Sequence, residues 1–237
     1  MGDNTMNNHT LDVCDLAKSY GERSLWSGVS FTLRPGQIMA LRGNSGSGKS
    51  TLLNAVGMLT GVDAGTITYA GKELRRSGWG ARKTRVETVS FLFQDYALVE
   101  DATVAENLDI AGRPRAFSKA RDYSDILARF GLQGRENSMV YVLSGGEQQR
   151  LSLARLCVRP TPIILADEPT AALDDTNTNI VLDALTTLAH EGRIILIATH
   201  SDHVAAIADT TLWLHHNGHT ITSTGEQNAA ALDTAAP

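Results

Sequence analysis

The stretch GNSGSGKST, residues 43–51, decides which fold this chain can adopt. It satisfies the pattern G-x-x-x-x-G-K-[ST] of a phosphate-binding loop. The apolar run at 38–41 predicts a buried strand before the loop, and residues 52–56 predict the opening turns of a helix after it. A glycine-rich loop between a strand and a helix points successive backbone N–H groups at phosphate oxygens. We therefore predict a nucleoside triphosphate site, in preference to a merely flexible glycine loop.

Each residue of this loop has an expected task. Lys49 brings a full positive charge to the β- and γ-phosphates, and the Ser50 hydroxyl is placed to ligate Mg²⁺. The predicted nucleotide-binding residues of the loop are Gly43, Asn44, Ser45, Gly46, Ser47, Gly48, Lys49, Ser50 and Thr51.

A second motif combines four apolar residues with two carboxylates, at 163–168. The continuous apolar run is typical of a parallel strand covered on both faces. Such a strand delivers Asp167 to Mg²⁺, and it places Glu168 near the γ-phosphate, where a carboxylate can polarise the attacking water as general base.

A third motif, LSGGEQQR at 143–150, opens a predicted helix. Ser144 is the expected N-cap, with Glu147 three residues on as in a capping box. The loop offers a second phosphate site, built from Ser144, Gly145 and Gly146. A second γ-phosphate cradle is useful only if two chains share one nucleotide, which indicates a two-fold dimer in which each Ser144 loop closes over the partner's phosphate-binding loop.

The part of the chain before the helical region alternates short strands and turns. Period-two patterning predicts strands at 11–16, 29–33 and 66–69, a turn at 18–21, and a further strand at 87–93. This indicates an antiparallel sheet beside the nucleotide-binding core.

Strand patterns are missing between residues 94 and 159, where we predict helices at 102–111, 118–130 and 147–158. The core resumes with strands at 162–167 and 193–198 and helices at 176–190 and 202–208. A last strand pair is joined at Asn217-Gly218, a hairpin signal.

The composition and net charge of the chain limit the classes of protein to which it can belong. With 237 residues, 42% of them hydrophobic, and a net charge of −5, the chain fits a globular α/β domain better than a nucleic-acid binder. No apolar run is long enough to span a bilayer.

Cys14 and Cys157 are expected to be buried thiols of a reducing compartment. His215, His216 and His219 flank a turn, where solvent-facing histidines are more common than a metal site.

Taken in order, these motifs resemble an ATP-binding-cassette (ABC) ATPase over residues 11–224. The resemblance implies that Tyr20 stacks on adenine, that Gln94 contacts Mg²⁺ and the attacking water, that Asp174 crosses the dimer interface, and that His200 contacts the γ-phosphate. Ala171 replaces a frequent glycine, and 140–142 depart from the usual lead into the third motif, but no chemical group is lost. The implied cofactors are ATP and Mg²⁺, the latter held by Ser50, Gln94 and Asp167.

The implied fold class is α/β, a P-loop NTPase (RecA-like) core with an antiparallel β subdomain and an inserted α-helical subdomain. We expect a polar leader at 1–10, a single ABC ATPase domain at 11–226 and a flexible tail at 227–237. Within the domain, the core and β subdomain are expected at 11–93 and 160–226, and the helical subdomain at 94–159.

Residues 93–98 and 103–108 are similar to stand-alone ATPases of the lipoprotein-release, macrolide-efflux and lactococcin-type bacteriocin-export group. Within that group, residues 96–100 most resemble the bacteriocin-export branch. This implies a cytoplasmic subunit, peripheral on the inner face of the cell membrane, that forms an ATP-dependent homodimer. A separate multi-span permease would contact the region 94–112, and the cargo would be a peptide, a lipid-linked molecule or an amphipathic molecule.

Two alternatives remain. One is a mechanical coupler that transports nothing, as in cell-division relatives. The other is a soluble cassette protein acting on DNA or ribosomes, which is disfavoured because we expect no tandem cassettes, coiled-coil arms or basic patches.

Overall fold

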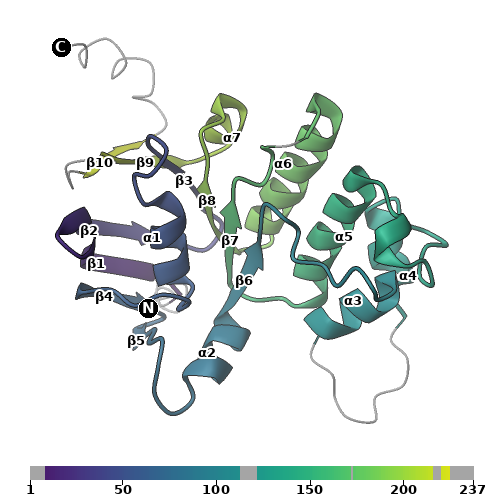
Figure 1. Ribbon diagram of the computed structural model, residues 1–237, viewed down its shortest axis with the longest axis horizontal. Coiled ribbons are helices and arrows are strands. Elements are labelled where there is room, and N and C mark those ends of the chain that lie inside the picture. The colour runs from purple at the N-terminus through teal and green to yellow at the C-terminus, as the bar shows by residue number, and fades with distance from the viewer. Residues whose placement is uncertain (1–8, 113–121, 172, 216–219, 225–237) are drawn as a thin grey trace, which may run out of the picture.

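The computed structural model describes residues 9–112, 122–171, 173–215 and 220–224. Two sheets organise this part of the chain (Figure 1). One has four strands in the order β2-β1-β4-β5, and the other has six in the order β10-β9-β3-β8-β7-β6.

The four-stranded sheet is antiparallel, as the sequence predicts. Its strands are β1 (Leu11–Tyr20), β2 (Arg23–Leu33), β4 (Ala64–Tyr69) and β5 (Lys72–Glu73). The turn predicted at 18–21 is wrong, because β1 continues to Tyr20, which pairs with Arg23, and the chain turns at residues 21 and 22.

The six-stranded sheet carries the nucleotide-binding motifs. Its strands are β3 (Ile38–Arg42), β6 (Val89–Leu92), β7 (Ile163–Asp167), β8 (Ile194–Ala198), β9 (Thr210–Leu214) and β10 (Thr220–Thr224). Every neighbouring pair is parallel except β9 and β10, which form the predicted antiparallel hairpin. The turn of this hairpin, with Asn217-Gly218, lies outside the described residues.

Alternate residues of the central strands feed two separate hydrophobic cores. Leu165 and Leu196 pack with α1 and the antiparallel sheet, whereas Ile164 and Ile195 pack with α5 and α6. Strands that are buried on both faces read as continuous apolar runs, which is why β7 and β8 were predictable.

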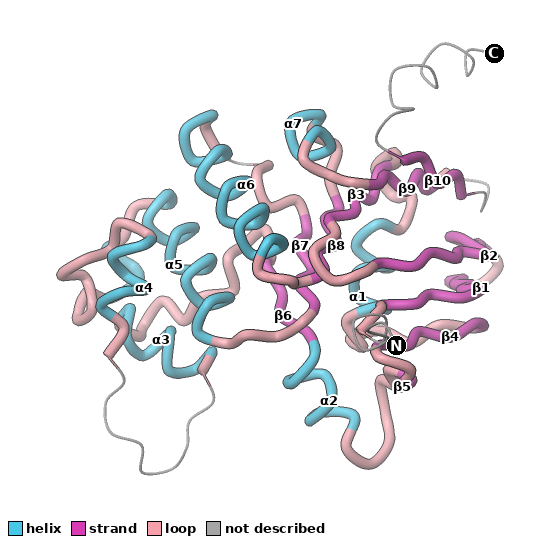
Figure 2. The backbone as a smooth tube through the Cα atoms, turned by 180° about the vertical axis from the view of Figure 1, so that it is seen from behind, coloured by secondary structure: helices cyan, strands magenta, loops and turns pink. Residues whose placement is uncertain are grey.

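Seven helices and one 3₁₀ turn occur among the described residues. They are α1 (Lys49–Val56), α2 (Ala81–Thr88), α3 (Val104–Ala111), α4 (Ser124–Arg129), the 3₁₀ turn Val140–Val142, α5 (Gly145–Val158), α6 (Asp175–His190) and α7 (Asp202–Ala206). Figure 2 shows α3, α4 and α5 grouped beyond β6 and β7, on the far side from β1 and β2.

Three predictions of local structure need correction. α2 was not predicted, and Glu87, expected at a strand start, lies inside it. α4 begins at Ser124, later than the predicted 118, and residues 118–121 lie outside the described part. Cys14 is exposed and Cys157 only partly buried, since Cys14 lies on the outward face of β1.

Candidate functional site

The glycine-rich loop leaves β3 and enters α1 under tight steric limits. A Cβ atom on Gly43 would collide with the backbone oxygen of Leu214, and one on Gly48 would lie 2.8 Å from the indole nitrogen of Trp26. Both glycines have positive φ, at 146° and 92°, a region that side chains rarely tolerate. The loop therefore has a fixed curve, with backbone close to its neighbours and to any ligand in its concave side.

Two side chains at the start of α1 make contacts in different directions, Lys49 back to the loop and Ser50 to the end of β7. The Lys49 ammonium group donates to the carbonyl oxygens of Gly43, at 2.8 Å, and Asn44, at 3.4 Å. The Ser50 hydroxyl donates to Asp167 Oδ1 at 3.0 Å, across the gap to the end of β7. The remaining predicted loop residues, Ser45, Gly46, Ser47 and Thr51, lie in the same turn and in the first turn of α1.

The Ser50–Asp167 pair is suited to Mg²⁺. Burial raises the pKa of Asp167; the Ser50 hydrogen bond opposes this rise, and the neighbouring Glu168 carboxylate adds to it. A cation beside Asp167 would offset the cost of keeping that carboxylate charged. A hydroxyl and a carboxylate are the oxygen donors that this hard cation prefers, so the residues present fit the ion that the motifs imply.

The end of β7 meets the end of β8 through a side-chain contact. Glu168 Oε2 lies 2.9 Å from Nδ1 of His200. The Glu168 backbone has φ 45°, unusual for a non-glycine residue, and its N–H donates to Ala198 O at 2.9 Å. This backbone turn directs the carboxylate away from the strand and toward His200, one strand away.

The position of His200 is fixed from a third strand. Arg42, the last residue of β3, donates to the His200 carbonyl oxygen at 3.3 Å and pairs with Asp202 at 2.7 Å. Its guanidinium also stacks over the Trp213 ring, 4.8 Å from the centroid. Arg42 thus joins the strand before the phosphate-binding loop to the segment that carries His200.

Tyr20 lies at the end of β1, beside the nucleotide-binding loop. The residue is 56% exposed, and Lys18 Nζ is 5.1 Å from the ring centroid. Tyr20 pairs with Arg23, whose guanidinium is 3.9 Å from the Cβ position of Gly46. An exposed ring this near the loop is available to stack on a base.

Gln94 leaves the sheet at the same edge as the two carboxylates. Leu92 pairs with Ala166 in the parallel register of β6 and β7, so the residues that follow each strand emerge together. The Gln94 side chain is exposed there.

Ser144 caps α5 in a complete capping box, as predicted. The Ser144 hydroxyl accepts from the Glu147 N–H at 3.3 Å, and the Glu147 carboxylate accepts from the Ser144 N–H at 2.9 Å. The hydrogen bond from the Ser144 N–H to the carboxylate is the main cause that lowers the pKa of Glu147, and the ion pair with Arg135 at 3.0 Å acts in the same direction. Ser144 and Gly145 are exposed, and Gly146 is half-buried.

Asp174 caps the next helix and is tied to the Ser144 loop through Asn177. The Asn177 amide donates to both Asp174 oxygens, at 3.1 and 3.0 Å. Its own oxygen lies 3.0 Å from the Cβ position of Gly146 and accepts from Arg150 at 3.4 Å. A side chain at Gly146 would disturb this link.

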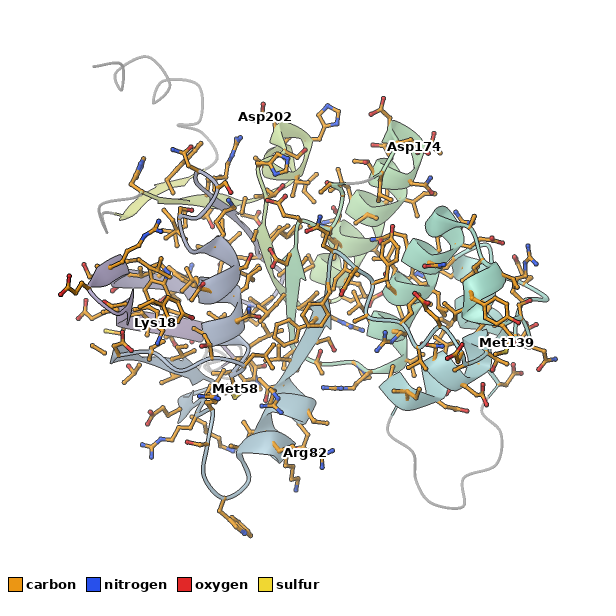
Figure 3. The ribbon with its side chains drawn as sticks, viewed as in Figure 1. Lys18, Met58, Arg82, Met139, Asp174 and Asp202 are labelled. Carbon is orange, nitrogen blue, oxygen red and sulfur yellow. The ribbon has the colours of Figure 1, made fainter. Side chains whose placement is uncertain are left out.

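The structure thus brings most predicted residues into one group and leaves four apart, namely Ser144, Gly145, Gly146 and Asp174. The grouped residues come from the loop, β1, β6, β7 and β8. Ser144 and Asp174 begin helices whose buried faces belong to the opposite core, across the central sheet from α1. In Figure 3 the labelled Asp174 lies at the same end of the molecule as Asp202, which follows His200.

Four contributing residues were missed from the sequence: Trp26, Arg42, Asn177 and Gln149. Gln149 is buried and donates to Pro169 O at 3.3 Å, joining α5 to the segment after Glu168. Trp26, Arg42 and Asn177 belong to none of the three motifs, whereas Gln149 lies within the third motif, where a polar residue that the helix buries could have drawn attention.

Two further features concern metals and membranes. In the described ranges, His, Cys, Asp and Glu form no group of three that could hold a metal ion, while His216 and His219 lie outside those ranges. No helix of the described residues has both the length and the apolar character for a membrane crossing.

Comparison with known proteins agrees with this geometry. The ABC transporter family profile matches residues 26–171. The chain is 39% identical to the lipoprotein-releasing system ATP-binding protein LolD of Novosphingobium aromaticivorans, over 79% of this chain and 86% of that protein. It is 38% identical to the pyoverdine export ATP-binding/permease protein PvdT of Pseudomonas putida and 37% identical to the macrolide export protein MacB of Hyphomonas neptunium, over 84% and 93% of this chain. The chain spans about a third of the length of these two ATP-binding/permease relatives.

Solved structures give the same picture. The dimeric ABC transporter cassette MJ0796 superposes with a TM-score of 0.80 at 28% identity, over 90% of this chain and 98% of that one. A post-hydrolysis state of MJ0796, dimeric and bound to ADP and phosphate, superposes with a TM-score of 0.79 at 26% identity.

Proposed function

The chain belongs to the ABC transporter family, and from that premise we propose that it is the ATP-hydrolysing subunit of an export system. The observation that carries the proposal is the contact between Glu168 and His200, beside the Ser50–Asp167 pair and the phosphate-binding loop. A triphosphate site alone would suit a binding protein, whereas a carboxylate held at that site by a histidine suits hydrolysis.

The loop N–H groups and Lys49 hold the β- and γ-phosphates, and Tyr20 stacks on the adenine. Mg²⁺, held by Ser50, Asp167 and Gln94, would supply charge neutralisation on the phosphate oxygens. The ammonium group of Lys49 exchanges its loop carbonyl partners for phosphate oxygens when the nucleotide binds.

Glu168 is the proposed general base. Its carboxylate accepts a proton from the attacking water as the oxygen–phosphorus bond forms, and the bond to the ADP oxygen breaks. His200, hydrogen-bonded to Glu168, orients that carboxylate and extends toward the γ-phosphate. Arg42 acts through His200 and is a positioning residue.

We propose that a second copy of the chain completes the site, and the support is the position of the predicted residues relative to the two hydrophobic cores. Since Ser144 and Asp174 start helices on the far side of the sheet from α1, their exposed ends are available to a partner's nucleotide rather than to their own. The dimeric MJ0796 cassette supports this arrangement. We propose an ATP-dependent homodimer in which Ser144, Gly145 and Gly146 contact the partner's γ-phosphate.

A cavity of about 370 Å³ is the proposed docking point for the membrane subunit. It opens between α2, β6, α3 and α5, and includes Tyr96, Ala97, Ile110 and Ala111 of the predicted contact region 94–112. Apolar Phe91 and Phe93 line it together with Arg85, Arg155 and Arg159. A short amphipathic helix that combines an apolar face with a carboxylate suits this lining.

The proposed cargo is a peptide, a lipid-linked molecule or an amphipathic molecule, moved outward. Support comes from the relatives, whose names concern pyoverdine export, macrolide export and lipoprotein release. The proposed location is the inner face of the cell membrane, with the chain held there by the permease. The proposed units are the core with the β subdomain (11–93 and 160–226) and the helical subdomain (94–159).

The test is capture of the membrane subunit. Glu168→Gln protein, loaded with ATP, is used to purify partners from detergent-solubilised membranes of the native host. We expect a multi-span membrane protein, and its loss with Ile110→Asp, because Ile110 is 52% exposed and lines the cavity. Thr187→Asp, on the exposed face of α6, is the matched control. Ribosomal proteins or DNA-repair factors in place of a permease would contradict the export role but not the ATPase chemistry.

A further inference from the structure

The connection from β5 to α2 concentrates positive charge around one tryptophan. Residues 72–85, here called the basic loop, hold six of the 21 lysines and arginines of the chain and a single carboxylate, Glu73. The segment therefore carries a formal charge of +5, while the whole chain carries −5. The expectation that the chain has no basic patch is wrong for this segment.

Most charged side chains of the basic loop, and its tryptophan, are exposed to solvent, whereas Leu74 is buried and Arg85 is partly buried. Trp79 is fully exposed, and it stands between Gly78 and Gly80, whose φ values are 109° and 84°. Left-handed backbone on both sides of the indole turns the chain away from it and leaves it at the tip. The exposed cations on either side are Lys72, Arg75, Arg76, Arg82 and Lys83. Only Arg75 is engaged by the carboxylate of the loop, since it pairs with Glu73 at 2.6 Å.

The basic loop lies away from the nucleotide site and beside the proposed permease cavity. Figure 3 shows the labelled Arg82 at the end of the molecule opposite to Asp174 and Asp202. Arg85 and Val86 of α2, which follows the tip, line the cavity described above. The loop therefore has no part in ATP binding, and it borders the surface that would face a membrane subunit.

We propose that the basic loop binds the anionic phospholipid surface of a bilayer, with Trp79 entering the headgroup layer. An indole is favoured at the membrane–water interface, where its ring is partly buried and its N–H remains hydrated. Lysines and arginines near an anionic leaflet each add attraction, and together they supply the charge that one aromatic anchor lacks.

Lipid fits these features better than nucleic acid does. A single projecting indole suits insertion into a soft interface, whereas nucleic-acid grooves are followed by an extended basic surface. The rest of the chain carries a formal charge of −10, since its total is −5 and the loop contributes +5, so the attraction to an anionic surface is confined to the loop. The inference goes beyond the proposed function and does not depend on the permease.

The test is vesicle binding by the purified full chain without ATP. Vesicles of phosphatidylcholine alone are compared with vesicles of equimolar phosphatidylcholine and phosphatidylglycerol, at low and high salt, by flotation. We expect binding to the anionic vesicles that weakens with salt, and little binding to the neutral ones. A DNA duplex and an RNA hairpin are measured beside them.

Variants locate the contact. Arg82→Gln/Lys83→Gln should weaken anionic-vesicle binding about 30-fold, at about fivefold per cation. Trp79→Ala should weaken it about tenfold, from lost apolar burial. Tyr141→Ala, which removes another exposed aromatic ring, and Arg34→Gln, which removes one exposed cation elsewhere, should bind as the unaltered chain does.

A spectroscopic readout reports on Trp79 itself. The chain has three tryptophans, of which Trp26 is buried and Trp213 half-buried beneath Arg42. Fluorescence should shift to the blue with anionic vesicles and be quenched by brominated acyl chains, and both changes should vanish in Trp79→Ala. Absence of vesicle binding, equal binding by the loop variants, or binding to DNA or RNA alone would overturn the lipid assignment. Unchanged ATP hydrolysis in Trp79→Ala would show that such a failure leaves the ATPase assignment intact.

Discussion

The Nδ1 atom of His200 lies 2.9 Å from Oε2 of Glu168, and this contact closes the gap between the ends of two parallel strands. His200 is 71% exposed at its side chain and Glu168 only 18%. The histidine therefore covers the carboxylate on its solvent side, which is where a nucleotide and a second chain would arrive.

Replacement of His200 should slow hydrolysis without preventing nucleotide binding. We expect His200→Ala to reduce kcat on the order of a hundredfold, because Glu168 loses the partner that orients it. ATP affinity should change little, since Lys49 and the loop N–H groups remain. Phosphate release and nucleotide titration measure the two effects. His203→Ala, an exposed histidine on α7, is the control, and an equal loss there would show that the effect is not specific.

Arg42 is predicted to support catalysis through His200 rather than through stability. Arg42→Gln should lower kcat roughly tenfold, because the His200 carbonyl loses its donor and the stacking on Trp213 is lost. Arg42→Lys should restore little, as an ammonium group cannot make the same planar stack and fork of hydrogen bonds.

The salt bridge between Arg42 and Asp202 provides the control for the Arg42→Gln prediction. Asp202 is 86% exposed at its side chain, so its ion pair adds little. Asp202→Asn should therefore keep nearly full turnover. If it lost as much activity as Arg42→Gln, the surface ion pair, and not the His200 contact, would be the relevant interaction.

Ser144 is predicted to act on the partner's nucleotide. Ser144→Arg should bind ATP normally but fail to form the ATP-dependent dimer, because a long cation fills the space meant for a phosphate. Size-exclusion chromatography of the Glu168→Gln background with ATP is the measurement. Ser124→Arg, at the start of α4, serves as the control. An unaltered dimer in Ser144→Arg would exclude the shared site.

The capping box of α5 predicts a pH-dependent stability. Glu147 has a pKa lowered by the Ser144 N–H, so its contribution is complete above its ordinary value of 4.5 and is lost as pH falls through the lower folded value. Glu147→Gln should cost about 1 kcal/mol of unfolding free energy at neutral pH. In urea titrations, the difference from the unaltered chain should shrink as the pH falls below that range.

A second capping box serves as a control that distinguishes an effect of Glu147→Gln on stability from an effect on dimerisation. Thr103 and Glu106 form the same arrangement at the start of α3. Glu106→Gln should show the same direction of pH dependence but leave dimerisation unchanged, whereas Glu147→Gln should also weaken the dimer. Equal effects on dimerisation would mean that the α5 cap has only a structural role.

The sequence predicted those parts of the structure that depend on short, local patterns. The loop at 43–51, the apolar strands β7 and β8, and the Ser144 cap each require residues adjacent in the chain. α2 was missed because Thr88 is its only buried residue, so it has no apolar periodicity to detect. Cys14 was misplaced because residue type alone was used, although strand alternation puts it on the outer face.

The supporting contacts could not be predicted in this way. Arg42 and Trp213 are far apart in the chain and meet only because β3 pairs with β9. Asn177 reaches Gly146 only because α5 and α6 pack in the same core. Such contacts follow from the tertiary arrangement, and residues like these carry no motif of their own.

The most direct test of the account is the turnover of Glu168→Gln with MgATP. If Glu168 is the general base, kcat should fall by at least about a hundredfold, while the variant still binds ATP and elutes as a dimer only when ATP is present. Glu191→Gln, an exposed carboxylate after α6, should hydrolyse ATP as the unaltered chain does. Near-normal hydrolysis by Glu168→Gln would contradict the central claim.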